Sequence, residues 1–396
     1  MKRALSPIAP TLAGFLVVAL GLWLVAGVEH SNLWAHTPYD SYTLQAMAWR
    51  DGHVALSQNY EWLELAIFKG DYYVSFPPLP SVVMWVLTFP FGENTPSGAV
   101  GVVYFVGGLL ALWALLRRYL PADQAALWLV FVALGGTILS LVSAGQGASG
   151  GVWFQAQLLA FFLTSLAFLL VDGKNKIGWV IGLSCLALAV GCRPFNLIYA
   201  PALLWMLSRH LGEVKLSALR YLAAPVAVLA VYGIYNFARF GNPTEFGHTY
   251  LPELAQAGTG MFLLSSVPTH LHNVLSAPSF EAGKLVIPQA GGFAVYLTNP
   301  MILIGLAVIL VRGVRRKADA LDAILLVTIL LHAVLLLSHR TNGGWQYGTR
   351  YLTDLLPVAT YVVARSGLRV RSAGAVAMGA VIAFNLYAIL VFQSAT

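Results

Sequence analysis

The residues of this chain with the clearest chemical potential stand just after its first long apolar segment. The stretch WAHTPYDSYTLQAMAWRDGH, residues 34–53, carries Asp40 near its centre. A carboxylate can take a proton from a hydroxyl, and it can also bind the free amides at the start of a helix. Thr37, Pro38 and Asp40 have the residue types expected at the N-cap, first and third positions of a helix that runs to Gly52. Both roles of Asp40 therefore stay open on local grounds.

A second candidate lies late in the chain, in NGGWQYGTRYLTDLLP, residues 342–357. Arg350 follows glycine-rich backbone that an anion can approach closely, and Asp354 comes four residues later, one helical turn away. An arginine–carboxylate pair at membrane depth is costly and is usually functional. The alternative is a structural ion pair that fixes the start of a helix.

Two further outward cations, Lys69 and Arg193, are candidates for binding an anion. Lys69 precedes Gly70 and a Pro-Pro element, although a lysine that extends along an interface would look the same. Arg193 lies between two apolar segments, before Pro194. Its alternative is ordinary loop placement.

Composition identifies an integral membrane protein, because 58% of the 396 residues are hydrophobic and only 10% are charged. The sequence predicts an all-α, polytopic protein with about eleven transmembrane helices. The predicted spans are residues 11–28, 96–116, 124–142, 152–171, 177–192, 195–208, 221–237, 293–311, 320–338, 351–364 and 373–393.

The distribution of positive charge predicts the orientation in the cell membrane. With a cytoplasmic N-terminus, most of the 23 Lys and Arg residues fall on the inner side. The net charge of +7 then reflects topology and anionic lipid, not nucleic acid. Most acidic residues fall outside, with a small set of cations: Arg50, Lys69, Arg193, Arg239, Lys284, Arg340 and Arg350.

Two outward loops, residues 29–95 and 238–292, are far longer than a turn requires. Both are rich in aromatic and aliphatic residues, so they are expected to fold. We expect the first to form a platform of two or three interfacial helices, with Trp85 and Tyr72 at the membrane interface. We treat residues 1–396 as a single domain that includes both loops.

The order of several motifs resembles the GT-C superfamily of membrane glycosyltransferases, in particular protein mannosyltransferases and aminoarabinose transferases. The motifs are the early Asp40, GDYYVSFPPL (70–79), GCRPFNLIYAP (191–201), YNFARFGNPTEFGHTY (235–250) and NGGWQYGTRYLTDLLP (342–357). The resemblance covers most of the chain.

This resemblance implies an inverting transfer of a hexosyl or pentosyl group from a polyprenyl-phosphate donor to an acceptor hydroxyl at the outer membrane face. The acceptor is a glycolipid, a polysaccharide or a protein. Asp40 matches the superfamily's general base, although a helix N-terminus should lower its pKa and weaken it. We expect Arg350, Lys69 and Arg193 to bind the donor phosphate. Supporting candidates are Asp354, Tyr39, Glu64, Tyr72, Tyr73, Arg239 and His248.

The resemblance implies a metal ion less strongly than it implies the donor and the general base. Some relatives carry a second acid in the outer loop between the third and fourth spans, but here residues 143–155 read SAGQGASGGVWFQ, without an acid. We therefore expect Arg and Lys to stabilise the developing charge and assign no cofactor. A divalent cation held by Asp40 and a glutamate of the first loop remains an alternative.

A transporter or flippase of lipid-linked sugars is the main rival function. Such proteins place ionisable groups or broken helices near the middle of the membrane. Here most predicted spans lack such groups, His332 is a rare ionisable residue in the middle of a span, and the charges gather at one surface. A purely structural membrane subunit is disfavoured by the elaborate outer loops.

Overall fold

The computed structural model describes residues 8–28, 32–143, 150–212, 216–258 and 260–394. These residues are mostly helical, with two small β-hairpins that an all-α prediction did not include. Their contacts gather in two compact units. The first unit comprises Met1–Ser31, Val106–Gln146 and Leu264–Thr396; the second comprises Asn32–Phe105 and Gly147–Leu263. The expectation of a single domain stays a prediction.

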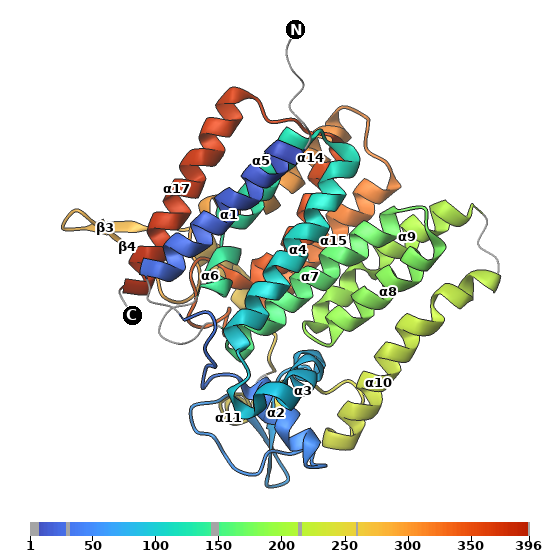
Figure 1. Cartoon of the computed structure of the whole chain (residues 1–396), viewed down its shortest axis with the longest axis vertical. Coiled ribbons are helices and arrows are strands. Elements are labelled where there is room, and N and C mark those ends of the chain that lie inside the picture. The colour runs from blue at the N-terminus through green and yellow to red at the C-terminus, as the bar shows by residue number, and fades with distance from the viewer. Residues whose placement is uncertain (1–7, 29–31, 144–149, 213–215, 259, 395–396) are drawn as a thin grey trace. The chain divides into compact units, whose positions relative to one another are not determined.

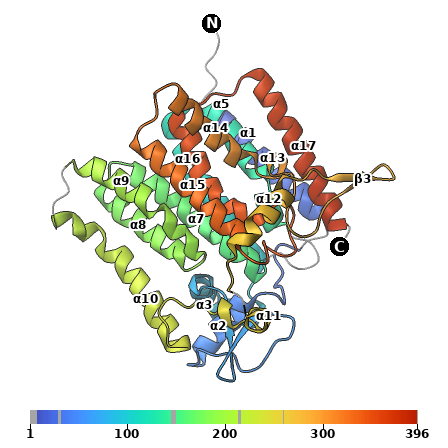
Figure 2. The ribbon, with the colours of Figure 1, turned by 180° about the vertical axis from the view of Figure 1, so that it is seen from behind.

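In the first unit, helix α1 packs against α5 and α17, and α14 packs against α16 (Figures 1 and 2). Its elements are α1 (Ile8–Val28), α5 (Ala122–Leu134), α6 (Ile138–Val142), η5 (Leu264–Ser266), α12 (Val267–Leu275), β3 (Ser279–Glu281), β4 (Lys284–Val286), α13 (Val295–Thr298), α14 (Pro300–Val314), α15 (Ala320–Ser338), η6 (Arg350–Leu355), α16 (Leu356–Ser366) and α17 (Ser372–Ser394).

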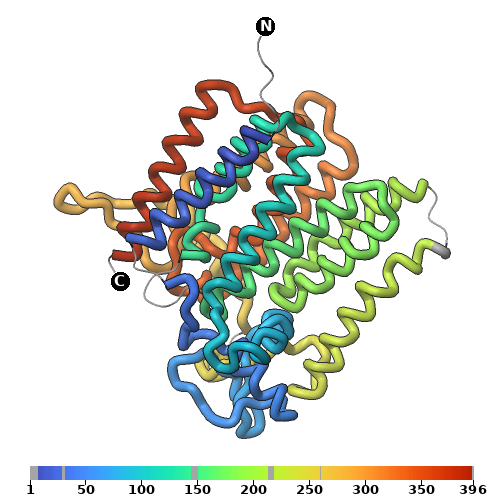
Figure 3. The backbone as a smooth tube through the Cα atoms, viewed as in Figure 1, coloured from blue at the N-terminus to red at the C-terminus, as the bar shows by residue number. Residues whose placement is uncertain are grey.

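In the second unit, α7 and α8 form a helical hairpin, α10 packs against α8, and α2 packs against α3 (Figure 3). Its elements are α2 (Ser41–Arg50), β1 (Leu65–Phe68), β2 (Asp71–Val74), α3 (Leu79–Phe91), η1 (Gly92–Asn94), α7 (Val152–Asp172), α8 (Lys176–Val190), η2 (Pro194–Tyr199), α9 (Ala200–Leu211), η3 (Leu216–Tyr221), α10 (Ala223–Phe240), η4 (His248–Tyr250) and α11 (Pro252–Ala257). Helix α4 (Ser97–Tyr119) contributes residues to both units.

Six helices within the described ranges are long and apolar enough to cross a membrane: α1, α4, α7, α10, α15 and α17. The prediction of a helical multi-pass protein is confirmed, whereas the count of about eleven spans is not. The other predicted spans are shorter or interrupted helices. Several interruptions coincide with proline at a helix start, as at Pro201, Pro300 and Pro357, because proline fits the first turn but cannot continue a preceding helix.

The first outer loop differs from its prediction at residues 65–74. Two helices form, α2 and α3, but the segment between them is an antiparallel hairpin in which Phe68 pairs with Asp71. Lys69 and Gly70 connect the strands with φ of 54° and 90°. A two-residue turn with both residues in the left-handed region matches the twist of the strands. The run of aliphatic and aromatic residues is also better suited to a strand than to a helix.

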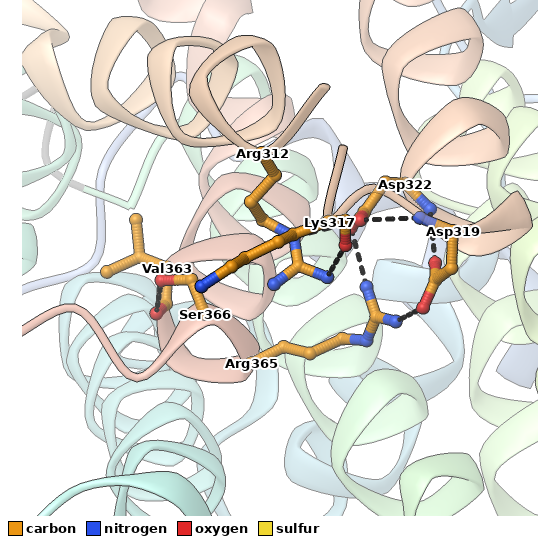
Figure 4. A network of polar contacts seen from close by, with 7 residues as sticks. All are labelled: Arg312, Lys317, Asp319, Asp322, Val363, Arg365 and Ser366. Atoms are coloured by element: carbon orange, nitrogen blue, oxygen red, sulfur yellow. Dashed lines mark hydrogen bonds and ion pairs between the residues drawn. The ribbon is translucent and has the colours of Figure 1, made fainter. Parts of the chain in front are cut away.

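A network of ion pairs joins three helices of the first unit (Figure 4). Asp322, near the start of α15, accepts from Arg312 Nε at 2.9 Å and from Arg365 Nη1 at 2.6 Å. Arg312 lies in the last turn of α14 and Arg365 in the last turn of α16, so one carboxylate links all three helices. Asp322 also forms a capping box with Asp319, which binds Arg365 as well.

We expect Asp322→Asn to destabilise the protein by roughly 2 kcal/mol or more, because the substitution leaves two arginines without their buried partner. Thermal unfolding in detergent measures the effect. Asp123→Asn is the matched control, since Asp123 lies exposed at the start of α5. Equal unfolding temperatures for the two variants would contradict a stabilising role of the network.

Candidate functional site

Asp40 is itself the N-cap of α2. Its carboxylate accepts from the Thr43 amide at 3.2 Å and from Thr43 Oγ1 at 2.6 Å. The helix therefore begins three residues later than predicted, and Thr37 is not its N-cap. Residues 37–40 form a turn instead, in which the Asp40 amide donates to Thr37 O at 3.2 Å. This turn holds the carboxylate over the first turn of α2.

The Asp40 carboxylate is almost completely buried, with only 1% of the residue exposed. Burial raises its pKa from the ordinary value of 3.8 to about 6, although hydrogen bonds from Thr43 and Gln155 and the neighbouring His36 act in the opposite direction. The hydrogen bonds at the helix N-terminus lower this pKa as expected, but desolvation outweighs them and the net shift is upward. Asp40 is thus a stronger base than an ordinary aspartate and is still mostly ionised at neutral pH.

Polar side chains from three elements surround Asp40. Tyr42 from α2 and Tyr104 from α4 lie within electrostatic range of the carboxylate, and the Gln155 side chain from α7 hydrogen-bonds to it. None of the three was a sequence-based candidate. The available signal was weak: Tyr104 and Gln155 are polar groups inside predicted spans, where such groups are costly.

Tyr39 connects the Asp40 turn to α7. Its ring packs against Trp153 at 5.6 Å between centroids, and its carbonyl accepts from the Val152 amide at 3.0 Å. Tyr39 is therefore placed to hold the Asp40 turn against the helix that carries Gln155. Its contacts support a positioning role.

A second polar group gathers around His248 in the same unit. Its Nδ1 donates to Ser75 O at 2.9 Å, and its ring packs edge-on against Phe76. Burial lowers the pKa of His248, with Glu64 and Arg193 within electrostatic range. Arg193 is also within range of Tyr42. Arg193 is thus the predicted cation that lies within electrostatic range of both His248 and Tyr42, a neighbour of Asp40.

Arg239 joins the hairpin to α10. It donates to Val74 O at 3.1 Å and to Asn236 Oδ1 at 2.8 Å, and its guanidinium lies over the ring of Phe240 at 4.6 Å. Tyr73 packs on the same phenylalanine at 5.3 Å. These contacts explain both residues as parts of the scaffold.

Tyr72 and Lys69 occupy more open positions of the hairpin. The Tyr72 carbonyl accepts from Leu56 N at 2.8 Å, and its side chain is half-buried. Lys69 is exposed at the turn, with Nζ 5.2 Å from the centroid of Phe68. A phosphate role for Lys69 stays a prediction.

Arg350 and Asp354 belong to the first unit, whereas the other predicted site residues belong to the second. Arg350 is buried, and its Nε and Nη2 both donate to Gly343 O, at 3.0 and 2.8 Å. The φ of 96° at Gly343 favours glycine, and a Cβ there would lie 2.6 Å from Gln346 Oε1. Arg350 therefore organises the glycine-rich loop. Asp354 is buried in the same short helix, η6.

The residues described by the structure contain no cluster of three or more His, Cys, Asp or Glu side chains suited to a metal ion. No such cluster among the described residues therefore supports the alternative of a divalent cation held by Asp40 and a first-loop glutamate. Glu64, the candidate glutamate, has an exposed side chain.

No protein-family model and no curated protein matches the sequence. Among solved structures, the chain is similar to the oligosaccharyltransferase AglB from Archaeoglobus fulgidus in complex with an inhibitory peptide and a dolichol-phosphate, at 13% identity and a TM-score of 0.48. It is also similar to ArnT from Cupriavidus metallidurans bound to undecaprenyl phosphate, at 12% identity and a TM-score of 0.48.

The matches cover 96% and 89% of this chain but only 55% and 59% of those proteins. Both neighbours are membrane glycosyltransferases of the GT-C superfamily, the kind of neighbour that the sequence resemblance predicted. With TM-scores below 0.5 and identities of 13% and 12%, these likenesses assign no function to this chain.

The raised pKa of Asp40 predicts a pH-dependent stability. The protonated form is favoured in the folded state, so its stabilisation is complete below pH 3.8 and is lost as the pH rises through about 6. At pH 8 the buried charge costs roughly 3 kcal/mol, and Asp40→Asn should remove much of this cost. We expect the variant to unfold at a higher temperature than the wild type at pH 8, with a smaller difference at pH 4.5. A variant that is less stable at pH 8 would contradict this.

Proposed function

We propose that this chain transfers a sugar from a polyprenyl-phosphate donor to an acceptor hydroxyl at the outer face of the membrane, with Asp40 as general base. The observation that carries the proposal is the buried Asp40 carboxylate, whose pKa of about 6 suits proton abstraction near neutral pH. The sequence motifs that resemble those of GT-C enzymes suggest the reaction type. Membrane-spanning helices fit a lipid-linked donor.

The proposed reaction needs only a base and a stabilised leaving group. The acceptor hydroxyl gives its proton to Asp40 while its oxygen attacks C1 of the sugar. The bond between C1 and the phosphate oxygen breaks, and the polyprenyl phosphate leaves with the electron pair. Because Asp40 is 1% exposed, the acceptor reaches it only when the surrounding packing opens. The closed packing would then keep water away from the sugar.

Among the predicted phosphate ligands, Arg193 has the best support. It is half-buried at the start of η2 and lies within electrostatic range of both Tyr42 and His248. Lys69 is exposed and Arg350 already binds Gly343 O through two nitrogens. We therefore propose Arg193 as the principal contact of the donor phosphate and Lys69 as a further contact. A phosphate role for Arg350, which belongs to the first unit, stays a separate prediction.

We expect Asp40→Asn to reduce sugar transfer by about a hundredfold to ten-thousandfold, because the amide cannot take the acceptor's proton. Binding of the lipid-linked sugar should persist. The wild-type rate should fall below about pH 6, where Asp40 becomes protonated. The rate is measured as the transfer of radiolabelled sugar from polyprenyl phosphate to the acceptors in a membrane extract.

Asp51→Asn is the matched control for this experiment, since Asp51 is exposed at the other end of the same helix. Normal transfer by the Asp40→Asn variant would refute the assignment of Asp40 as general base. Loss of lipid-linked sugar binding together with transfer would make Asp40 a binding residue and would also refute the assignment. Movement of the lipid-linked sugar across vesicles without any transfer would instead establish the flippase alternative.

Arginine variants should separate phosphate binding from loop structure. We expect Arg193→Ala to weaken binding of undecaprenyl phosphate roughly ten- to hundredfold, the effect of losing hydrogen bonds to a charged group, with Arg193→Lys partly restoring it. Arg350→Ala should lower the unfolding temperature, because the loop loses its contacts at Gly343. Binding to protein in lipid nanodiscs measures the affinity. Unchanged affinity in Arg193→Ala would exclude its phosphate role.

A further inference from the structure

Three buried polar atoms near Asp40 have no hydrogen-bond partner within the described part of the chain: the hydroxyls of Tyr42 and Tyr104 and Oε1 of Gln155. Tyr42 and Gln155 are 0% exposed and Tyr104 is 5% exposed. An unsatisfied buried polar group costs about 1–3 kcal/mol. Such groups are uncommon in folded proteins and call for an explanation.

These groups form one cluster and are not scattered. Tyr42 and Tyr104 lie within electrostatic range of each other and of Asp40, and the amide of Gln155 hydrogen-bonds to Asp40. A nearby buried tyrosine behaves differently: the Tyr232 hydroxyl donates to Leu188 O at 3.2 Å. Among the described residues, the ordinary buried hydroxyl of Tyr232 thus has a partner, whereas the hydroxyls beside Asp40 have none.

The chemistry of the cluster indicates what it would bind. Each phenol donates one hydrogen bond and accepts others, whereas the amide oxygen only accepts. Burial keeps the pKa of Tyr42 well above its usual range, so this phenol stays neutral. Two neutral phenols and an amide beside a carboxylate do not suit a phosphate, because nothing in the set offsets the repulsion between the two anions. These groups match alcohol groups, which both donate and accept, and saccharides carry alcohols on adjacent carbons.

We propose that Tyr42, Tyr104 and Gln155 bind the hydroxyl groups of a saccharide next to the position where Asp40 acts. They would then determine which sugar is accepted. The assignment rests on the proposed function for placing these contacts at the site of transfer. The saccharide belongs either to the donor or to the acceptor, since the hydroxyl chemistry is the same for both.

The test removes one hydroxyl at a time, with Tyr42→Phe and Tyr104→Phe. Each should lower kcat/KM about three- to tenfold, the effect of one neutral hydrogen bond, without lowering the unfolding temperature. The control is Tyr232→Phe, which loses a bond to Leu188 O and should lower the unfolding temperature while leaving kcat/KM unchanged. A structural role for Tyr42 and Tyr104 would produce the pattern of the control and overturn the proposal.

Binding to nanodisc-embedded protein distinguishes the two sources of the saccharide. The probes are bare undecaprenyl phosphate, its mannosyl, glucosyl and arabinosyl derivatives, and the corresponding methyl glycosides as acceptors. If the tyrosines bind the donor sugar, the wild type prefers one glycosylated lipid over the bare lipid and both Phe variants lose that preference. If they bind the acceptor, the preference persists and the KM for a methyl glycoside rises.

These results also separate this proposal from the proposed function. A tyrosine-dependent preference for a glycosylated lipid in a protein that transfers no sugar would refute the transferase and support the saccharide site. Normal transfer, with both Phe variants equal to wild type in binding and kinetics, would refute the saccharide site alone. A wild type without preference for any glycosylated lipid and without saturation by any methyl glycoside would refute it as well.

Discussion

The candidate site depends on the burial of one charge. Asp40 sits at a helix N-terminus and accepts hydrogen bonds from Thr43, an arrangement that normally lowers the pKa of a carboxylate. With 1% of the residue exposed, the loss of water has the larger effect and the pKa rises to about 6. The hydrogen bonds prevent a further rise, so the group remains ionised at neutral pH and is still basic. Capping and proton transfer are thus compatible roles of the same side chain.

Several contacts in the second unit connect its elements to one another. The carbonyl of Tyr39 binds the start of α7, which carries Gln155. The hairpin of β1 and β2 is tied to α10 by Arg239, whose bond to Val74 O fixes one strand. Ser75, directly after that strand, accepts from His248. Arg239 and His248, which looked like separate substrate contacts in the sequence, therefore both bind the backbone at the end of β2.

The sequence predicted what depends on hydrophobic length and failed where tertiary contacts decide. Predicted span 320–338 coincides with α15, because an uninterrupted apolar run has few alternatives in a membrane. Residues 65–74 form a hairpin because Lys69 and Gly70 adopt left-handed conformations, which sequence patterns indicate only weakly. Asp40 was found from its position, but its raised pKa depends on burial by segments distant in the chain. Tyr42 was missed for the same reason, since an unsatisfied hydroxyl is visible only in three dimensions.

The free energy of folding favours a ligand-binding role of this cluster over a structural one. The ionised Asp40 makes folding less favourable at neutral pH, and so do the hydroxyls of Tyr42 and Tyr104, which have no hydrogen-bond partner among the described residues. Asparagine would cap α2 without a charge, and phenylalanine would fill the space of each tyrosine without a polar atom. A residue retained only for stability would be expected to take these forms. The presence of two such hydroxyls beside one buried carboxylate is typical of a site shaped for a ligand rather than for folding.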